Sequence, residues 1–372
     1  MIYLDYAAST PVESEVLDVF CDVSKKYYGN PNVNHDMGNK ARELISKSVS
    51  NIASNLGVKP EEIIFTSGAS ESNNLVIKGI CERYKNKGKH VLISSLEHNS
   101  ILSSAMVMQE MGFEVELIPI NSNGLIDIDA LKSMIRDDTI LISVCAVDSE
   151  IGLKQPILEI GELLKKYPNC YFHSDASQSV GKVDIDFSNV DLITITPHKF
   201  YGLQGISILI KKEHVSLKPQ INGGKSTTIY RSGTPETASI VACDKALEIA
   251  LSKMNERYVY ISKLNKVIKD DLKLKKNVFI NNRDNSIPHV INFSVKGIKA
   301  TELQKRFNDE NIYVSTKTSC CPAETPSKMI YALTQDKTLS MSSIRVSLSH
   351  LTTMDEILEF LRVFDNIYKE QE

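Results

Sequence analysis

The 372-residue sequence has neither an excess of basic residues nor a long apolar run. Its formal net charge is −3 at pH 7, with 43 Lys and Arg residues against 46 Asp and Glu residues. No stretch approaches the roughly 20 apolar residues of a membrane-spanning helix. Nucleic acids and membrane surfaces select for gathered positive charge, which this chain lacks. We therefore expect no membrane span, no membrane-surface binding and no direct contact with nucleic acid.

The sequence also has no C-x-x-C pair, although it has seven cysteines (Cys21, Cys81, Cys145, Cys170, Cys243, Cys320 and Cys321). Zinc sites use paired cysteine spacings, and disulfide-rich secreted domains use an even set. Neither pattern is present, so we expect no metal site. The first six residues include Asp5 and lack the basic and apolar regions of a signal peptide. A reducing, cytoplasmic setting is the expectation.

Apolar residues make up 42% of the chain, which is enough for a large core. Helical patterns over 12–27 and 39–56 come first, and short apolar runs then alternate with further helical segments. We expect strands at 62–66, 90–94, 113–119, 139–145, 170–174, 190–195 and 206–210, with helices at 71–86, 99–111, 129–136 and 156–167. Such alternation predicts an α/β fold with a mainly parallel seven-stranded sheet covered on both faces.

The pattern changes in the last third of the chain. Thr234 is a candidate N-cap and Pro235 a first-turn proline of a long helical stretch that extends toward Leu274. Strands near 288–295, 312–315 and 344–348, with helices near 300–310 and 353–370, then indicate a small α+β domain. The expected division is a large domain over 12–250 and a small domain over 1–11 together with 251–372.

Two chemically distinct side chains follow neighbouring apolar runs. Asp175 ends one run and Lys199 follows the next, 24 positions later, about the length of a strand, a connection and another strand. Parallel strands would bring both to the edge of the sheet where α/β folds bind ligands. A carboxylate and an amine suit pyridoxal 5'-phosphate (PLP), which bonds a lysine and pairs its ring nitrogen with an acid. For this pair alone, two surface residues are the simpler interpretation.

Two further turns between a strand and a helix carry candidate ligand-binding groups. The small residues from Thr66 to Ser70 would leave helix-start N–H groups open to an anion, although an ordinary turn has the same composition. His98 would stack on a planar ligand and exchange protons near neutral pH, or simply cap its helix. The same two interpretations apply to His198.

The C-terminal region adds a thiol pair and an arginine. Cys320 and Cys321 precede a proline-rich loop, where an exposed thiolate would be a nucleophile and a buried thiol would be inert. Adjacent cysteines do not easily bridge each other, so a disulfide between them is not expected. Arg345 lies in an alternating strand and would bind a carboxylate bidentately or form a structural salt bridge.

The order of these motifs resembles that of NifS-type cysteine desulfurases, in the class V aminotransferase group of fold-type-I PLP enzymes. The resemblance covers nearly the whole chain, at 3–11, 29–31, 65–74, 97–98, 150–152, 175–182, 198–202, 223–224, 231–234 and 343–348. It implies the PLP-dependent transferase fold of type I, with a large α/β domain and a small α+β domain.

The resemblance also implies roles for individual residues. Lys199 would form the Schiff base with PLP, Cys320 would be the nucleophile, and His98 would stack on the ring and move protons. Asp175 would pair with the ring nitrogen and Gln178 with the phenolic oxygen. Ser70, Thr196 and His198 would bind the phosphate with the backbone of Gly68 and Ala69, and Thr234 would reach it from the partner subunit. Arg345 would bind the substrate carboxylate, with Ser149 beside it.

The activity that the resemblance implies is a cysteine desulfurase, which converts L-cysteine to L-alanine and keeps the sulfur as an enzyme persulfide. The sulfur would pass to an acceptor protein, such as an iron–sulfur scaffold or a tRNA thiolase, and a homodimer with shared active sites is implied.

Four departures from the family pattern leave alternatives open. Asp148-Ser149 replaces an Asn-Asn pair, 315–319 is poorer in Gly and Ala, Cys321 is an extra thiol, and Asn222 replaces a histidine. The alternatives are another class V activity, such as a transaminase or a selenocysteine lyase, and a weakly active scaffold protein with a degenerate active site.

Overall fold

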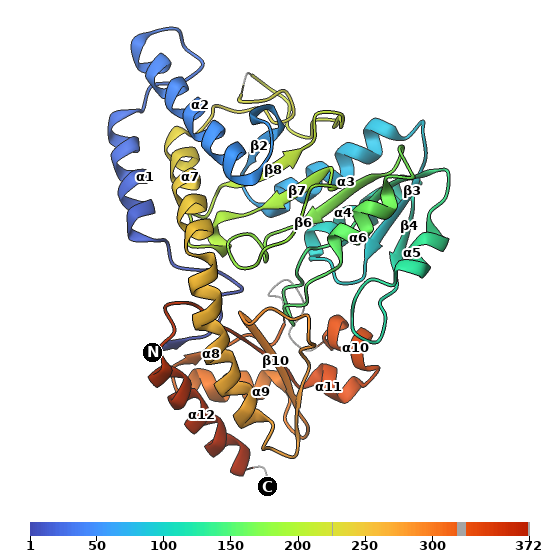
Figure 1. The fold of residues 1–372 in the computed structure, drawn as a ribbon, viewed down its shortest axis with the longest axis vertical. Coiled ribbons are helices and arrows are strands. Elements are labelled where there is room, and N and C mark those ends of the chain that lie inside the picture. Colours follow the sequence, from blue (N-terminus) through green and yellow to red (C-terminus); the bar gives the residue numbers. More distant parts are fainter. Residues whose placement is uncertain (225, 318–324, 371–372) are drawn as a thin grey trace.

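A seven-stranded sheet forms the centre of the larger part of the protein (Figure 1). The computed structural model describes residues 1–224, 226–317 and 325–370. The strand order is β2-β8-β7-β6-β5-β3-β4. The bounds are β2 Ile63–Thr66, β3 His90–Ser94, β4 Glu114–Ile118, β5 Thr139–Ser143, β6 Tyr171–Asp175, β7 Leu192–Ile195 and β8 Ser207–Lys211. Strand β8 runs antiparallel to its neighbours β2 and β7, and all other adjacent strands of this sheet are parallel, so the expected mainly parallel sheet is confirmed.

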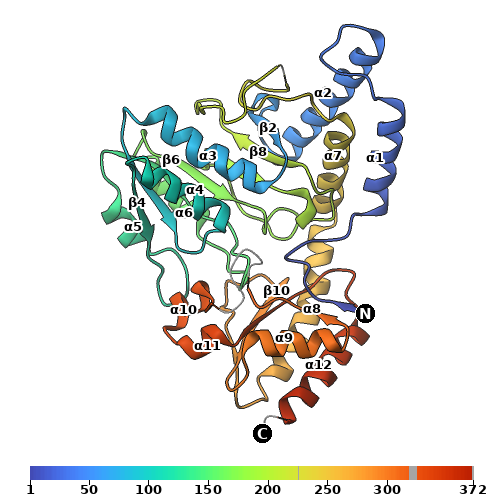
Figure 2. The ribbon, with the colours of Figure 1, turned by 180° about the vertical axis from the view of Figure 1, so that it is seen from behind.

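Helices cover both faces of this sheet, because its strands are apolar on both sides. On one face, α3 Ala69–Tyr84 and α4 Asn99–Glu110 pack side by side over a core that includes Ile77, Ile101 and Leu209 (Figure 2). A second core lies on the other face. The helices that contribute to it are α1 Ser14–Lys26, α2 Asp36–Leu56, α5 Ile128–Met134, α6 Ile157–Leu164 and α7 Thr237–Ser252.

The C-terminal part builds a separate apolar core around a three-stranded antiparallel sheet, in the order β12-β10-β9 (Figure 1). Its strands are β9 Val278–Ile280, β10 Val290–Val295 and β12 Ser343–Ser347. Its helices are α8 Met254–Leu272, α9 Ala300–Asp309, α10 Lys328–Thr334, α11 Lys337–Met341 and α12 Met354–Lys369. The sequence predicted a small α+β region here. The expected domain boundaries, between residues 11 and 12 and between residues 250 and 251, stay a prediction.

Two expectations for this region need correction. Thr234 is not the N-cap of α7, because the helix begins at Thr237 and the Glu236 side chain accepts from the Ser239 N–H at 2.7 Å. The long helical stretch is two helices, which meet at Lys253 with non-helical dihedral angles of −100° and 1°. The short elements β9, α10 and α11 were not anticipated.

The N-terminal segment connects the small sheet to the larger part of the protein, near the end of β7. Strand β1 Ile2–Tyr3 pairs in parallel with β11 Ile312–Tyr313, and the Ser347 N–H donates to the Leu4 carbonyl at 2.7 Å. The chain then crosses to the larger part, where Ala7 accepts a hydrogen bond from Lys199. Within the described ranges, no helix has the length and apolar character needed to cross a membrane.

Candidate active site

Asp175 and Lys199 lie at the same edge of the central sheet, as the sequence predicts. Asp175 is the last residue of β6 and faces Thr194 of the parallel strand β7. Lys199 closes the 3-10 helix η2 Pro197–Lys199, which follows β7. Both residues line a pocket of about 490 Å³. The pocket is also lined by residues from the β2–α3, β3–α4 and β5–α6 connections, the N-terminal segment and β12.

The β2–α3 turn presents a helix start to this pocket. Gly68 precedes the 16-residue helix α3, and a Cβ built on Gly68 would meet no heavy atom within 4 Å. Ser70 lies in the first turn of α3, and its side chain, which carries a hydroxyl group, is exposed. The first N–H groups of a helix attract anions, and small residues leave them accessible. The turn therefore has the donors and the space that a phosphate needs.

The carboxylate of Asp175 is fixed from two sides. Its Oδ1 accepts from the Ser177 N–H at 2.9 Å, and its Oδ2 accepts from Asn73 Nδ2 at 2.8 Å. Asn73 also donates to Ser100 Oγ at 2.9 Å, which ties α3 to the start of α4. Each carboxylate oxygen has a second lone pair, so Asp175 can still accept from a ligand in the pocket.

The amine of Lys199 is held against the N-terminal segment. Its Nζ donates to the carbonyls of Ala7 and Ala8 at 2.9 and 2.5 Å. His98 lines the same pocket and caps α4, because its Nδ1 accepts from the Ser100 N–H at 3.1 Å. Burial lowers the pKa of His98, Asp175 opposes this shift and Lys199 adds to it. His98 is therefore a neutral ring beside the amine at pH 7. Its capping of α4 is confirmed, and its stacking on a planar ligand with proton exchange stays a prediction.

Arg345 reaches the pocket from β12 and is 2% exposed. Its Nη2 donates to Asp5 Oδ1 at 2.7 Å, and its Nη1 donates to the Ser149 carbonyl at 2.9 Å. Arg345 thus forms a structural salt bridge and also offers a guanidinium to the pocket. Ser149 contributes its backbone oxygen to this arrangement.

Comparisons with known proteins agree with this geometry. The sequence model of the family described as Aminotransferase class-V matches residues 2–360. The chain belongs to this family. It is 36% identical to the protein named cysteine desulfurase IscS of Dictyoglomus turgidum, over 98% of this chain and 94% of that protein.

Two solved structures show the same fold. A protein titled NifS-like superposes with a TM-score of 0.93 at 30% identity, and 99% of each chain is covered. A structure titled SspA in complex with cysteine superposes with a TM-score of 0.81 at 32% identity, over 94% of this chain and 99% of that one. The fold type expected from the sequence is confirmed.

Most of the predicted site residues of this family member line the pocket: Gly68, Ala69, Ser70, His98, Ser149, Asp175, Gln178, His198, Lys199 and Arg345. Thr196 is fully buried instead, and its Oγ1 lies 3.1 Å from His198 Nδ1. Burial, Lys199 and Lys182 lower the pKa of His198 to about 4. Thr234 is exposed, and its expected role in a partner's site stays a prediction. Cys320 and Cys321 lie outside the described residues.

Asp148, where the family pattern has an asparagine, accepts hydrogen bonds from three backbone N–H groups. Its Oδ1 accepts from the N–H groups of Glu150 and Ile151 at 2.8 and 2.9 Å, and its Oδ2 accepts from Leu153 at 2.6 Å. An asparagine oxygen could accept from the first two donors, but its NH2 group could not accept from the third. Asp148 therefore shapes the turn that carries Ser149.

Glu97 is a further buried group whose role the sequence did not reveal. It is 7% exposed, and within the described part of the chain neither carboxylate oxygen has a hydrogen-bond partner at good geometry. Burial raises the pKa of Glu97 well above 4.5, Asp175 raises it further, and the Cys145 backbone opposes the shift. Only the fold could show this, because the motif Glu97-His98 does not reveal the burial of its acid.

We expect Glu97→Gln to change how stability depends on pH. Folded Glu97 keeps its proton at pH values where the unfolded chain releases it, so wild-type stability falls as pH rises above about 4.5. The variant has no such group, and its stability relative to wild type should rise by up to about 1.4 kcal/mol per pH unit. Urea unfolding of both proteins without added cofactor, between about pH 5 and about pH 8, measures the difference.

Glu62→Gln is the matched control, because Glu62 is equally buried at 5% exposure but has partners. Burial alone would raise its pKa, yet the N–H groups of Lys59 and Glu213 and the Lys212 amine lower it. The advantage of wild type over this variant should stay constant above about pH 5 and shrink below it. A constant gap between wild type and Glu97→Gln would show that Glu97 is ionised in the fold.

Proposed function

We propose that this chain is a PLP-dependent cysteine desulfurase. It converts L-cysteine to L-alanine and transfers the sulfur to Cys320 as a persulfide. The observation that carries the proposal is the convergence of Lys199, Asp175 and Arg345 on one pocket. The names of the similar proteins support it, since one is a cysteine desulfurase and another was solved in complex with cysteine.

The residues of the pocket fit PLP. The α3 start at Gly68 would bind its phosphate, Asp175 its ring nitrogen and Lys199 its aldehyde carbon, with His98 over the ring. Asp175 is pre-oriented by Ser177 and Asn73, so it is ready to accept from a protonated ring nitrogen. When bound, PLP supplies an electron sink for the carbon that carries the amino group of the substrate.

The side chains of this chain supply position and proton transfer. Arg345 binds the substrate carboxylate and so places the amino acid beside Lys199. Lys199 and the neutral His98 carry protons to and from substrate carbon atoms. The Cys320 thiolate attacks the substrate sulfur, and the C–S bond breaks with its electrons leaving toward carbon. Carbon is then protonated, so L-cysteine and one thiol give L-alanine and one persulfide.

The wider setting is part of the same proposal. The protein would act in the cytoplasm as a homodimer in which Thr234 completes the partner's phosphate site. The persulfide would be passed to an acceptor protein of iron–sulfur cluster assembly or tRNA thiolation. Thr234 is exposed and lies outside the pocket of its own chain, which supports a role across a subunit interface.

The alternative of a scaffold protein with a degenerate site rested on Asp148-Ser149. Asp148 stabilises the turn by accepting backbone hydrogen bonds, and the Ser149 carbonyl accepts a hydrogen bond from Arg345. A backbone contact does not depend on the side chain, so this departure is compatible with an intact carboxylate site. A transaminase would share the pocket but would not need the thiol at 320.

A single assay tests the proposal. The purified protein, loaded with PLP, should show a yellow absorption band and should form equal amounts of alanine and of released sulfide from L-cysteine when a thiol reductant is present. A protein that takes up no PLP would contradict the proposal entirely. Uptake of PLP with transfer of the amino group to a keto acid, without sulfide, would favour the transaminase.

We expect Arg345→Lys to raise the KM for L-cysteine by roughly tenfold to hundredfold with a smaller change in kcat. Lysine cannot bind a carboxylate bidentately, and a hydrogen bond to a charged group is worth about 1.5–3 kcal/mol. Lysine also lacks the planar fork with which Arg345 reaches Asp5 and the Ser149 carbonyl. Steady-state kinetics with L-cysteine measures the effect.

Arg257→Lys is the control for the loss of a buried guanidinium. Arg257 is 6% exposed and pairs with Glu13 at 2.5 Å, but it does not line the large pocket. Its KM should stay within about twofold of the wild-type value. An unchanged KM in Arg345→Lys would show that the substrate carboxylate binds elsewhere.

A further inference from the structure

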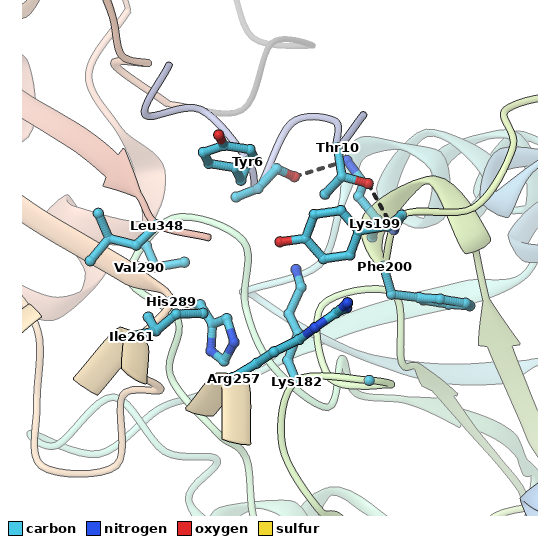
Figure 3. Close-up of a pocket in the computed structure, with 13 residues that line it drawn as sticks. Tyr6, Thr10, Lys182, Lys199, Phe200, Arg257, Ile261, His289, Val290 and Leu348 are labelled. Carbon is cyan, nitrogen blue, oxygen red and sulfur yellow. Dashed lines mark hydrogen bonds between the residues drawn. The ribbon is translucent and has the colours of Figure 1, made fainter. Parts of the chain in front are cut away.

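A second, much smaller cavity lies behind Lys199. Its volume is about 10 Å³, and its walls include Lys182, Lys199, Arg257 and His289. Figure 3 shows the Lys182 amine pointing into this cavity, with His289 and Arg257 beside it. Lys199 and Ala7 line both the small cavity and the large pocket, so the two spaces share a wall. Lys182 therefore shares this cavity with three other basic side chains.

Lys182 is 8% exposed, and burial lowers its pKa to about 7, with further contributions from Lys199 and Arg345. Burying an amine among cations is unfavourable unless it makes a specific contact. Lys182 makes that contact with a pocket residue, since its Nζ donates to Gln178 Oε1 at 2.7 Å. Gly181, with a φ of 74°, forms the tight turn that returns Lys182 to the side of Gln178.

The Gln178 amide is held at both ends. Its Oε1 accepts from Lys182, and its Nε2 donates to the Ala7 carbonyl at 2.9 Å. A lysine nitrogen has a hydrogen to donate in either protonation state, and a carbonyl can only accept. The Ala7 carbonyl therefore requires this orientation of the amide, and the Lys182 donor stabilises it. The second N–H of Nε2 bonds neither of these neighbours. It can donate to a ligand in the large pocket, because Gln178 lines that pocket.

We propose that Lys182 is a positioning residue, which fixes the Gln178 amide so that an N–H donor faces the phenolic oxygen of PLP. The inference rests on the proposed function, because it concerns how the cofactor is held. Without Lys182 the Gln178 oxygen loses its donor and only the Ala7 carbonyl holds the amide, so the N–H donor is no longer fixed toward the phenolic oxygen. The effect of Lys182 on the cofactor then passes through Gln178.

A double-mutant cycle tests this pathway. Lys182→Met should weaken equilibrium binding of PLP by about tenfold and shift the absorption maximum of the bound cofactor. Gln178→Leu should have a similar effect. In the double variant, Lys182→Met should cause almost no further loss of PLP affinity, because its partner is already gone. Titration of the apoprotein with PLP, followed by absorbance, gives both readouts.

Lys211→Met is the matched control. Lys211 is 4% exposed, and its amine donates to the carbonyls of Lys212 and Val215 at 3.0 and 2.9 Å, at the opposite edge of the sheet. This variant should keep the wild-type PLP affinity and spectrum. Lys182→Gln, which keeps a donor for Gln178, should restore most of the affinity. Lys182→Leu replaces Lys182→Met in the cycle if the methionine variant does not fold.

Two outcomes separate this inference from the proposed function. Additive losses in the cycle, or a Lys182→Met variant that matches Lys211→Met, would overturn the role of Lys182 and leave the desulfurase proposal intact. A wild-type protein that takes up no PLP would overturn the proposed function itself.

Discussion

Lys199→Ala is expected to remove the yellow absorption band of the PLP-loaded protein and to lower turnover of L-cysteine by about a thousandfold or more. Lys199 would supply both the covalent link to the cofactor and a proton carrier beside the substrate, and a positioned acid or base alone is worth about 10²–10⁴ in rate. The structure places its amine at the sheet edge beside Asp175 and His98, which line the same pocket. Absorbance spectra and alanine formation measure the two effects.

Lys199 also has a structural contact, and its loss must be separated from the chemistry. Its amine donates to the carbonyls of Ala7 and Ala8, which belong to the segment that joins the two sheets. Lys199→Arg keeps a cation that can donate to these carbonyls but cannot form the link to PLP. It should therefore keep the wild-type melting temperature and still lack the band. A yellow, active Lys199→Ala protein would rule out Lys199 as the cofactor lysine.

The strands of the central sheet could be predicted because most of them are short, largely apolar runs, and those in the first half of the sheet alternate with helices. Their order along the chain also placed Asp175 and Lys199 at one edge, since both follow parallel strands. The cap of α7 was placed at Thr234 because threonine is a strong capping residue. Glu236 took this position instead, since its longer side chain reaches the Ser239 N–H. The short elements β9, α10 and α11 have too few residues for a periodic pattern.

The chemistry of the pocket was predicted less completely than its position. The partner of Arg345 is Asp5, 340 positions away, and no local pattern could pair them. The raised pKa of Glu97 depends on its burial, and the effect of Lys182 depends on a turn that faces a second cavity. Such features arise from tertiary packing, so a sequence motif can name the residues without showing their protonation or their partners.

The sulfur-carrying thiol gives the second large effect. Cys320→Ala is expected to lower alanine formation from L-cysteine by about a hundredfold or more, because no other group proposed for the site is a soft nucleophile. PLP affinity and the absorption band should be unchanged, since the residues that bind the cofactor are intact. Alanine assays, with mass spectrometry of the trapped persulfide, measure the result.

Cys321→Ala is the matched variant, because it removes a thiol from the next residue in the chain. The described residues on either side of this segment lie close together, since Lys317 Nζ donates to Thr325 Oγ1 at 2.8 Å. Cys320 and Cys321 are adjacent in the sequence, so their positions in the chain do not choose between them. If Cys321→Ala loses activity and Cys320→Ala keeps it, Cys321 carries the sulfur. If neither substitution lowers turnover, sulfur leaves without a protein persulfide, and the reaction is closer to that of a lyase.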